Sequence, residues 1–138
     1  EKINPQVIRI LSKEGFIPVI SSIGVGYQGE SYNINADSVA GELAIALEAA
    51  KLILLTDVEG IYEQPDDPKT LISALHIEQA RKLVARGKIS AGMIPKVEAC
   101  IKAVENGVPR THIIDGRTKH SMLLEIFTDK GIGTMVVA

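Results

Sequence analysis

A single lysine follows a glycine turn near the middle of the chain, in the run Ser90-Ala-Gly-Met-Ile-Pro-Lys96. A backbone that turns at Gly92 into a helix presents unpaired N–H groups and the positive end of the helix dipole. Both attract anions, and Lys96 adds a mobile positive charge about one turn further along. The run therefore predicts an anion site suited to phosphate chemistry. A glycine turn followed by a surface lysine is the simpler interpretation.

Three polar residues, Asn33, Asn35 and Asp37, stand where an extended stretch meets a predicted helix. Alternation along the extended stretch puts Asn33 and Asn35 on one side. Their amides can donate to and accept from a ligand that carries carboxylate or amide groups, and Asp37 could orient lysines near a phosphate. Helix capping is the competing explanation, and it accounts for one of the three residues.

Thr56 and Asp57 follow the most apolar stretch of the chain, and Gly60 closes the turn that they begin. A hydroxyl, a carboxylate and backbone groups in such a turn can hydrogen-bond a ribose or a base. An ordinary β-turn, with Asp at a favoured position and Gly at its end, explains the same residues. Glu59 is expected to be exposed.

Several familiar motifs are absent from the sequence. It has no G-x-x-x-x-G-K-[ST] phosphate loop, no G-x-G-x-x-G fingerprint and no H-R-D or D-F-G signature of protein kinases. The histidines at 76, 112 and 120 have no ligand-like spacing with cysteines or carboxylates, so no metal site is expected.

The composition is that of one soluble globular domain spanning residues 1–138, with a net charge of −2 and 46% apolar residues. No basic field, aromatic platform, secretion signal or membrane-spanning run is present, so neither nucleic acid nor membrane is expected as a partner. The one cysteine, Cys100, lies in the apolar stripe of a predicted helix and is interpreted as a buried structural thiol in a reducing compartment.

The elements that must position these residues alternate between helix and strand. Apolar residues at helical spacing predict helices over residues 5–14, 37–49, 77–85, 93–104 and 120–127. Short apolar runs predict strands over residues 16–22, 30–34, 51–56, 111–114 and 134–137, with 51–56 buried on both faces. The pattern predicts an α/β fold with a mostly parallel sheet, at whose carboxyl edge the polar loops 33–37, 56–60 and 115–117 should meet.

The segments Tyr32–Glu42, Leu52–Tyr62 and Gly92–Glu98 together resemble the amino acid kinase family. Within it, Ile113–Arg117 and His120–Thr134 resemble the arginine-sensitive acetylglutamate kinases. The resemblance runs from end to end of the chain but corresponds to the C-terminal half of such an enzyme. It implies a three-layer α/β/α sandwich that supplies most of the ATP site, with the N-terminal, substrate-binding half absent.

The activity that the resemblance implies is phosphorylation of the γ-carboxylate of N-acetyl-L-glutamate by ATP with Mg²⁺, which gives an acyl phosphate in arginine biosynthesis. A carboxylate is already ionised at neutral pH, so the reaction needs no base. Both reactants are anions, so catalysis should depend on positioning and charge neutralisation. The chain by itself is expected to be inactive.

The resemblance also assigns roles to residues. Lys96 would contact the phosphates, Asp37 would organise the catalytic lysines, and Asn33, with Asn35 beside it, would hold the acetylated substrate. The residues implied for the ATP pocket are Thr56, Asp57, Gly92, Met93 and Lys96. The residues implied for an L-arginine effector site are Lys69, His120, Glu125, Gly131 and Gly133. Glu125 suits that ligand because a carboxylate accepts from both arms of a guanidinium.

One residue departs from the family pattern. Ala91 stands where the family usually has the first of two glycines, so a turn that needed a positive φ at this position would be strained.

Further expectations follow from the resemblance alone: a homo-oligomer, L-arginine as inhibitor, a PII-type signalling protein as partner, and a cytoplasmic or plastid location. The alternatives are a non-catalytic module that senses arginine or nucleotide, a related carbamate or glutamate 5-kinase, and an α/β domain whose motifs serve only as caps and turns. The stretch from His120 to Thr134 argues against the other kinases.

Overall fold

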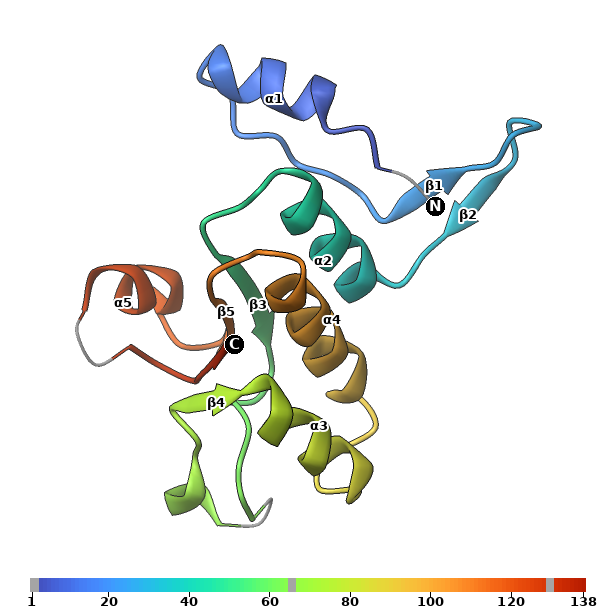
Figure 1. Ribbon diagram of the computed structural model, residues 1–138. Coiled ribbons are helices and arrows are strands. Elements are labelled where there is room, and N and C mark those ends of the chain that lie inside the picture. The colour runs from blue at the N-terminus through green and yellow to red at the C-terminus, as the bar shows by residue number, and fades with distance from the viewer. Residues whose placement is uncertain (1–2, 65–66, 129–130) are drawn as a thin grey trace.

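The structure is a computed structural model, and it describes residues 3–64, 67–128 and 131–138 (Figure 1). Its main sheet has the strand order β3-β5-β6-β4. The strands are β3 (Leu52–Thr56), β4 (Ala74–His76), β5 (Thr111–Asp115) and β6 (Thr134–Val137). The β3–β5 and β4–β6 pairs are parallel and the β5–β6 pair is antiparallel, so the sheet is mixed but mostly parallel, as predicted.

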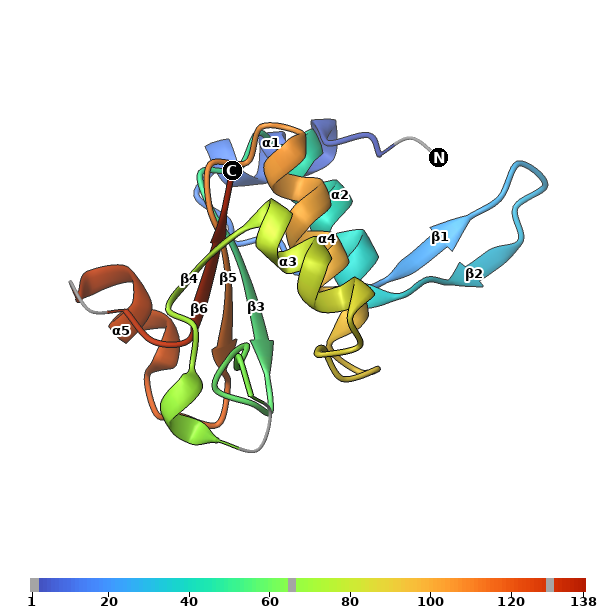
Figure 2. The same ribbon diagram turned by 60° about the horizontal axis from the view of Figure 1, so that its bottom comes forward.

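Helices lie on both faces of this sheet (Figure 2). On one face lie α2 (Ala36–Ala46), α3 (Ile77–Ala85) and α4 (Ile94–Glu105), and α5 (Ser121–Phe127) lies on the other. The predicted α/β/α sandwich is therefore confirmed. Between α4 and the strands, Val97 and Cys100 pack into the core. Burial raises the pKa of the Cys100 thiol to about 11, which fits the predicted structural role.

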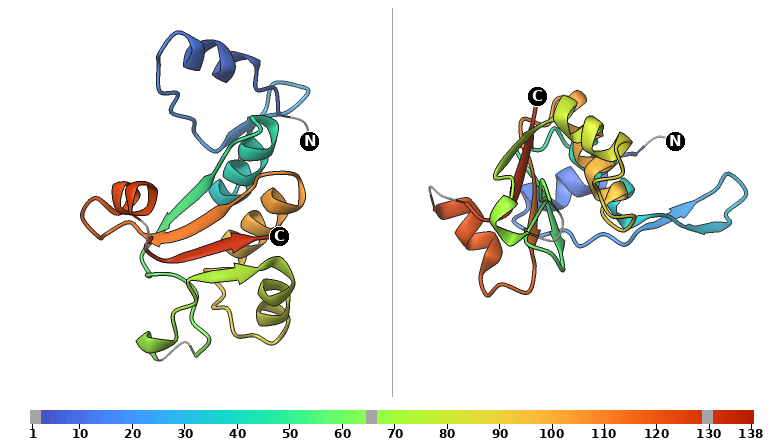
Figure 3. Two further views of the ribbon diagram at one scale, coloured as in Figure 1. Left: turned by 60° about the vertical axis from the view of Figure 1, so that its left-hand side comes forward. Right: turned by 90° about the horizontal axis from the view of Figure 1, so that it is seen from below.

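Residues 3–34 lie to one side of the main sheet, as the left view of Figure 3 shows. They form α1 (Gln6–Lys13) and a two-stranded antiparallel hairpin of β1 (Ile23–Val25) and β2 (Ser31–Asn33). The helix at 5–14 and the return strand at 30–34 are confirmed. The strand predicted at 16–22 is wrong, because residues 16–22 form no strand and β1 begins only at Ile23.

The position of β3 in the sheet corrects a second expectation. The sequence predicts a strand buried on both faces, yet β3 is an edge strand and Leu55 is 50% exposed. Leu52 and Leu54 point into the core, whereas Leu55 points to the opposite face, which α5 covers only in part. Local apolar content predicted the strand but not what covers each of its faces.

Between β3 and β4 the chain forms a 3₁₀ turn at Pro68–Thr70, within a polar, proline-containing loop at residues 63–70. Two residues of that loop, 65 and 66, lie outside the described residues. Gly87 and Gly107 have positive φ and end α3 and α4, as expected of C′ glycines. Among the described helices, none has both the length and the apolar content needed to span a bilayer.

Candidate functional site

The most specific contact between sequence-predicted residues joins α2 and α4. Lys96 Nζ lies 3.2 Å from Asp37 Oδ1 and 3.0 Å from Asp37 Oδ2. Both side chains are about four-fifths buried. The two helices approach closely because α2 carries Gly41, where a Cβ would lie 3.3 Å from the carbonyl oxygen of Ala99. The structure thus brings together a lysine and a carboxylate that stand 59 residues apart.

The carboxyl end of β3 meets the start of α4. Thr56 Oγ1 lies 3.2 Å from Asp57 Oδ1 and 4.0 Å from Met93 Sδ. The neighbouring strand β5 ends at the same edge, where the Gly116 N–H donates to the Thr56 carbonyl at 2.8 Å. Thr56, Asp57 and Met93, three of the residues implied for an ATP pocket, therefore lie together.

The turn before α4 needs no unusual backbone. Neither Ala91 nor Gly92 is among the described residues with positive φ, so the turn does not have the geometry that would strain Ala91. The N–H groups of Met93 and Ile94 both donate to the Ser90 carbonyl, at 2.9 and 3.2 Å. The N–H groups of Ala91 and Gly92 donate to no described residue, which leaves two donors free at the start of α4.

Asn33 and Asn35 have different surroundings. Asn35 is the N-cap of α2, and its Oδ1 accepts from the Ser38 N–H at 3.1 Å, so the capping explanation holds for this residue. Asn33 ends β2 opposite Ile23 and is exposed, four residues before Asp37. Both asparagines are exposed, and only Asn35 has a side-chain hydrogen bond among those between described residues.

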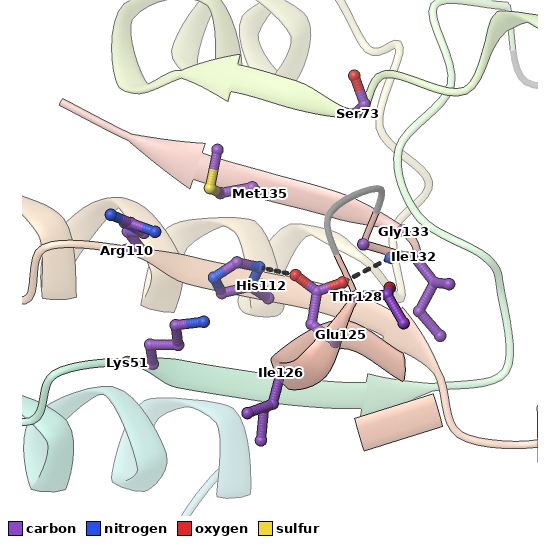
Figure 4. Close-up of a pocket in the computed structure, with 11 residues that line it drawn as sticks. Lys51, Ser73, Arg110, His112, Glu125, Ile126, Thr128, Ile132, Gly133 and Met135 are labelled. Carbon is purple, nitrogen blue, oxygen red and sulfur yellow. Dashed lines mark hydrogen bonds and ion pairs between the residues drawn. The ribbon is translucent and has the colours of Figure 1, made fainter. Parts of the chain in front are cut away.

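A second site is a cavity of about 320 Å³ on the face of the sheet that carries α5 (Figure 4). Its lining residues come from the strands, α5 and the segment after it: Lys51, Ser73, Arg110, His112, Glu125, Ile126, Thr128, Gly131, Ile132, Gly133 and Met135. Three residues of the implied effector site, Glu125, Gly131 and Gly133, are among them. Lys69 and His120 are not.

Glu125 and His112 form a buried pair in this cavity. His112 Nδ1 lies 2.6 Å from Glu125 Oε1, and the two side chains are 4% and 8% exposed. The other carboxylate oxygen accepts from the Ile132 N–H at 2.6 Å. The Nε2 atom of His112 has no hydrogen-bond partner among the described residues. Each oxygen of the Glu125 carboxylate thus has one partner, and the Nε2 atom of His112 has none among the described residues.

Burial lowers the pKa of His112 below its ordinary value of 6.5. The carboxylate of Glu125 opposes this shift, whereas the positive charges of Lys51 and Arg110 add to it. At a given pH, His112 is therefore neutral in a larger fraction of molecules than a free histidine would be.

Sequence reasoning missed Lys51, Arg110 and His112. Arg110 and His112 are two residues apart at the start of β5, so they share a face, and His112 lies opposite Ile53 of β3. Polar residues at alternate positions of an otherwise apolar strand were the signal that could have revealed them. His120 instead precedes α5, exposed and with φ +61°, and Lys69 is exposed in the 3₁₀ turn.

No group of three or more His, Cys, Asp or Glu side chains within residues 3–64, 67–128 and 131–138 could hold a metal ion.

Comparisons with solved structures agree with the fold. The N-acetylglutamate synthase of Neisseria gonorrhoeae complexed with coenzyme A and L-arginine superposes with a TM-score of 0.90 at 30% identity, over 99% of this chain and 31% of that one. The isopentenyl phosphate kinase of T. acidophilum superposes with a TM-score of 0.68 at 20% identity, over 96% of this chain and 53% of that one, a likeness of fold alone.

Comparisons of sequence identify relatives about twice as long. The acetylglutamate kinase of Moorella thermoacetica is 61% identical over 137 residues, and that of Heliobacterium modesticaldum is 62% identical over 136 residues. Each match covers 99% of this chain but 46% of the relative, so the chain spans about half the length of these curated relatives. The family model described as "Amino acid kinase family" matches residues 1–115. With most of its length matched, this chain belongs to the amino acid kinase family.

Proposed function

We propose that this chain forms the nucleotide-binding half of a kinase that transfers phosphate from ATP, bound with Mg²⁺, to the γ-carboxylate of N-acetyl-L-glutamate. The observation that carries the proposal is the Lys96–Asp37 pair, held at the start of two packed helices beside the carboxyl end of β3. The relatives that are acetylglutamate kinases support the choice of substrate.

In the proposed reaction, a γ-carboxylate oxygen forms a bond to the γ-phosphorus while the bond from that phosphorus to the bridging oxygen breaks. ADP leaves with the electron pair, and no proton is transferred. Negative charge spreads over the oxygens of the moving phosphoryl group, and Lys96 would neutralise part of it. Asp37 would hold the ammonium group in place until the phosphate arrives.

The surrounding residues have supporting roles in this proposal. The free N–H groups of Ala91 and Gly92 would bind phosphate oxygens at the positive end of α4. Thr56, Asp57 and Met93 would line the nucleoside side of the pocket, and Asn33 would contact the acetylated substrate. The N-terminal half of a complete kinase would supply the remaining substrate contacts.

The test uses a complete kinase that contains this sequence. Lys96→Ala should lower kcat on the order of a hundredfold, because the variant loses a charge that stabilises the transition state. Lys102→Ala is the matched control: Lys102 is also on α4 and also pairs with a carboxylate of α2, Glu42, but it is 61% exposed. The control should keep kcat near that of the wild type, since exposed ion pairs contribute little. An unchanged kcat in Lys96→Ala refutes the proposal.

The cavity around Glu125 and His112 supports a second role, inhibition by L-arginine. In Figure 4 the Glu125 carboxylate lies to one side of His112, and Lys51 and Arg110 lie to the other. L-Arginine carries a guanidinium at one end and a carboxylate at the other, which matches this separation of charge. The superposed N-acetylglutamate synthase, a complex with L-arginine, supports the same ligand.

Calorimetric titration of the complete kinase with L-arginine and with L-citrulline tests this role. Citrulline has the same shape, but an uncharged urea group replaces the guanidinium, so it should bind more than about tenfold more weakly if Glu125 receives the cation. Equal affinity for the two ligands, or no binding of L-arginine, would remove the effector role and leave the catalytic proposal intact.

A non-catalytic module that senses arginine or nucleotide is the alternative class. Calorimetric binding of L-arginine without binding of ADP would favour that class over the kinase. Homo-oligomer formation, binding of a PII-type protein and a cytoplasmic or plastid location rest on the resemblance alone and stay predictions.

A further inference from the structure

The imidazole of His112 carries a buried nitrogen that no described residue satisfies. Its side chain lines the cavity beside α5 and is 4% exposed. The Nδ1 atom lies 2.6 Å from Glu125 Oε1, whereas the Nε2 atom has no hydrogen-bond partner among the described residues. Buried polar side-chain atoms are nearly always hydrogen-bonded in folded proteins. The Nε2 atom of His112 is therefore a candidate contact for a ligand in this cavity.

The Glu125 carboxylate decides which nitrogen of neutral His112 carries the proton. Glu125 is held in place from a second side, because its Oε2 atom accepts from the Ile132 N–H at 2.6 Å. An ionised carboxylate only accepts hydrogen bonds, so the Nδ1 atom of His112 must be the donor to it. In a neutral imidazole the other nitrogen is then an acceptor. The Nε2 atom thus has a lone pair that suits an N–H group of a ligand.

The charged groups around His112 come from three parts of the fold. Glu125 lies on α5, Lys51 directly precedes β3, and Arg110 directly precedes β5. The segment 131–133 and β6 contribute no titratable side chain to the cavity lining. In Figure 4 the imidazole lies between the Glu125 carboxylate on one side and the two cations on the other. Because its Nδ1 atom faces Glu125, the Nε2 atom is directed toward the side of the cations.

We propose that His112 determines the specificity of the effector site, with its Nε2 atom accepting a hydrogen bond from the α-ammonium group of a bound amino acid. The carboxylate of the ligand lies on Lys51 and Arg110, and the ammonium group, attached to the same carbon, reaches His112. The guanidinium at the other end of L-arginine reaches Glu125. The inference rests on the effector role proposed above for this cavity and not on the role of Lys96.

The contact with His112 should discriminate strongly against ligands that lack the amine. Hydrogen bonds that involve a charged group contribute enough to change an affinity by about tenfold to a hundredfold. The negative charge of Glu125 strengthens the contact, because it polarises the imidazole and makes Nε2 a better acceptor. The cavity therefore favours free α-amino acids over side-chain analogues that carry only the guanidinium and the carboxylate.

The test compares two ligands on a complete kinase that contains this sequence. They are L-arginine and 5-guanidinopentanoic acid, which is arginine without its amine. Calorimetric titration should show the analogue binding about tenfold to a hundredfold more weakly to the wild type. In His112→Asn this difference should shrink to less than about threefold, because the asparagine amide can donate to Glu125 but does not reach the position of Nε2. His112→Gln should keep most of the difference, since its longer side chain places an amide oxygen there.

His76→Asn is the matched control. His76 is an exposed histidine at the end of β4, in the same sheet but outside the cavity lining. This variant should leave both dissociation constants unchanged. The ratio of the two constants measured on one variant does not depend on the fraction of that variant that is folded, so partial unfolding does not imitate the expected effect.

Nitrogen NMR of the wild type tests the proposal without any substitution. The Nδ1 atom of neutral His112 should carry the proton, and the Nε2 signal should shift more with L-arginine than with its deaminated analogue.

Three results would overturn the proposal. They are equal affinity of the wild type for the two ligands, equal affinity ratios in His112→Asn and His112→Gln, and a proton on Nε2 of the neutral wild-type ring. In all three L-arginine still binds, so the effector role survives. Absence of L-arginine binding overturns this inference together with the effector role, whereas an unchanged kcat in Lys96→Ala concerns the catalytic proposal alone.

Discussion

Lys96 is held by both carboxylate oxygens of Asp37, so its flexible side chain is already directed before any ligand binds. Ordering a free lysine side chain costs about 1.5–2 kcal/mol of rotamer entropy. Because the contacts with Asp37 already restrict the Lys96 side chain, less of this entropy is lost when a ligand binds. Lys102 and Glu42 join the same two helices, but their side chains are 61% and 37% exposed. Burial therefore distinguishes the candidate catalytic pair from an ordinary surface pair.

At the same scale, the pair of His112 and Glu125 makes stability depend on pH. The pKa of His112 is lowered in the folded chain, mainly by burial, with Glu125 opposing the shift and Lys51 and Arg110 adding to it. The unfolded chain therefore binds more protons than the folded chain once the pH falls below about 6.5. The stability that neutral His112 contributes is fully present above this pH and is lost as the pH falls through the folded pKa.

Urea unfolding at pH values between about 7.5 and 5 checks this prediction. The midpoint should fall with pH in the wild type and fall less in His112→Asn. His120→Asn is the control, because His120 is exposed and asparagine tolerates its positive φ. An NMR titration of His112 should give a pKa below 6.5. A His112 pKa above 6.5 would contradict the prediction, because His112 would then add stability as the pH falls.

At the scale of elements, two glycines that the resemblance assigns to ligand sites differ in whether the fold requires glycine at their position. Gly133 has φ +86°, and a Cβ there would collide with the backbone carbonyl of Ile113 and lie 2.8 Å from that of Glu59. Gly92 has no positive φ, and a Cβ there would meet nothing within 4 Å. The segment entering β6 therefore requires glycine, whereas the turn before α4 does not require it for folding.

The two alanine variants test this difference. Gly133→Ala should lower the free energy of unfolding by more than ~1 kcal/mol, because both the φ angle and the space are incompatible with a side chain. Gly92→Ala should leave that free energy nearly unchanged and instead weaken ADP binding, since the added methyl group would stand where the backbone approaches phosphate. Chemical unfolding and calorimetric titration of the two variants give the comparison. Equal destabilisation by both substitutions would contradict it.

Several elements could be predicted from the sequence because their signals are local. The apolar spacing of residues 77–85 and the apolar run of 134–137 gave the bounds of α3 and β6 as the structure has them. β4 was missed, because Ala74–His76 is a three-residue strand that forms only by pairing with β6. Residues 16–21 have strand composition without a strand partner, so composition alone misled the assignment.

At the scale of the whole molecule, the chain joins a packed three-layer body to an N-terminal region whose apolar surface is uncovered. α4 contributes six buried residues to the core, whereas α1 contributes none. The relatives are about twice as long as this chain. The proposed kinase activity would then need the part of those relatives that this chain does not match.

The sequence by itself determined the α/β class, most helices and the order of motifs that resemble the amino acid kinase family. The class and the helices follow from the periodicity of apolar residues, and the motifs are read from residues adjacent in the chain. Tertiary structure alone decided that Lys96 meets Asp37, that Asn35 is a cap, and that His112 rather than His120 lies against Glu125. Those contacts depend on how α2 packs on α4 and on which face of β5 lies toward α5, and local spacing fixes neither.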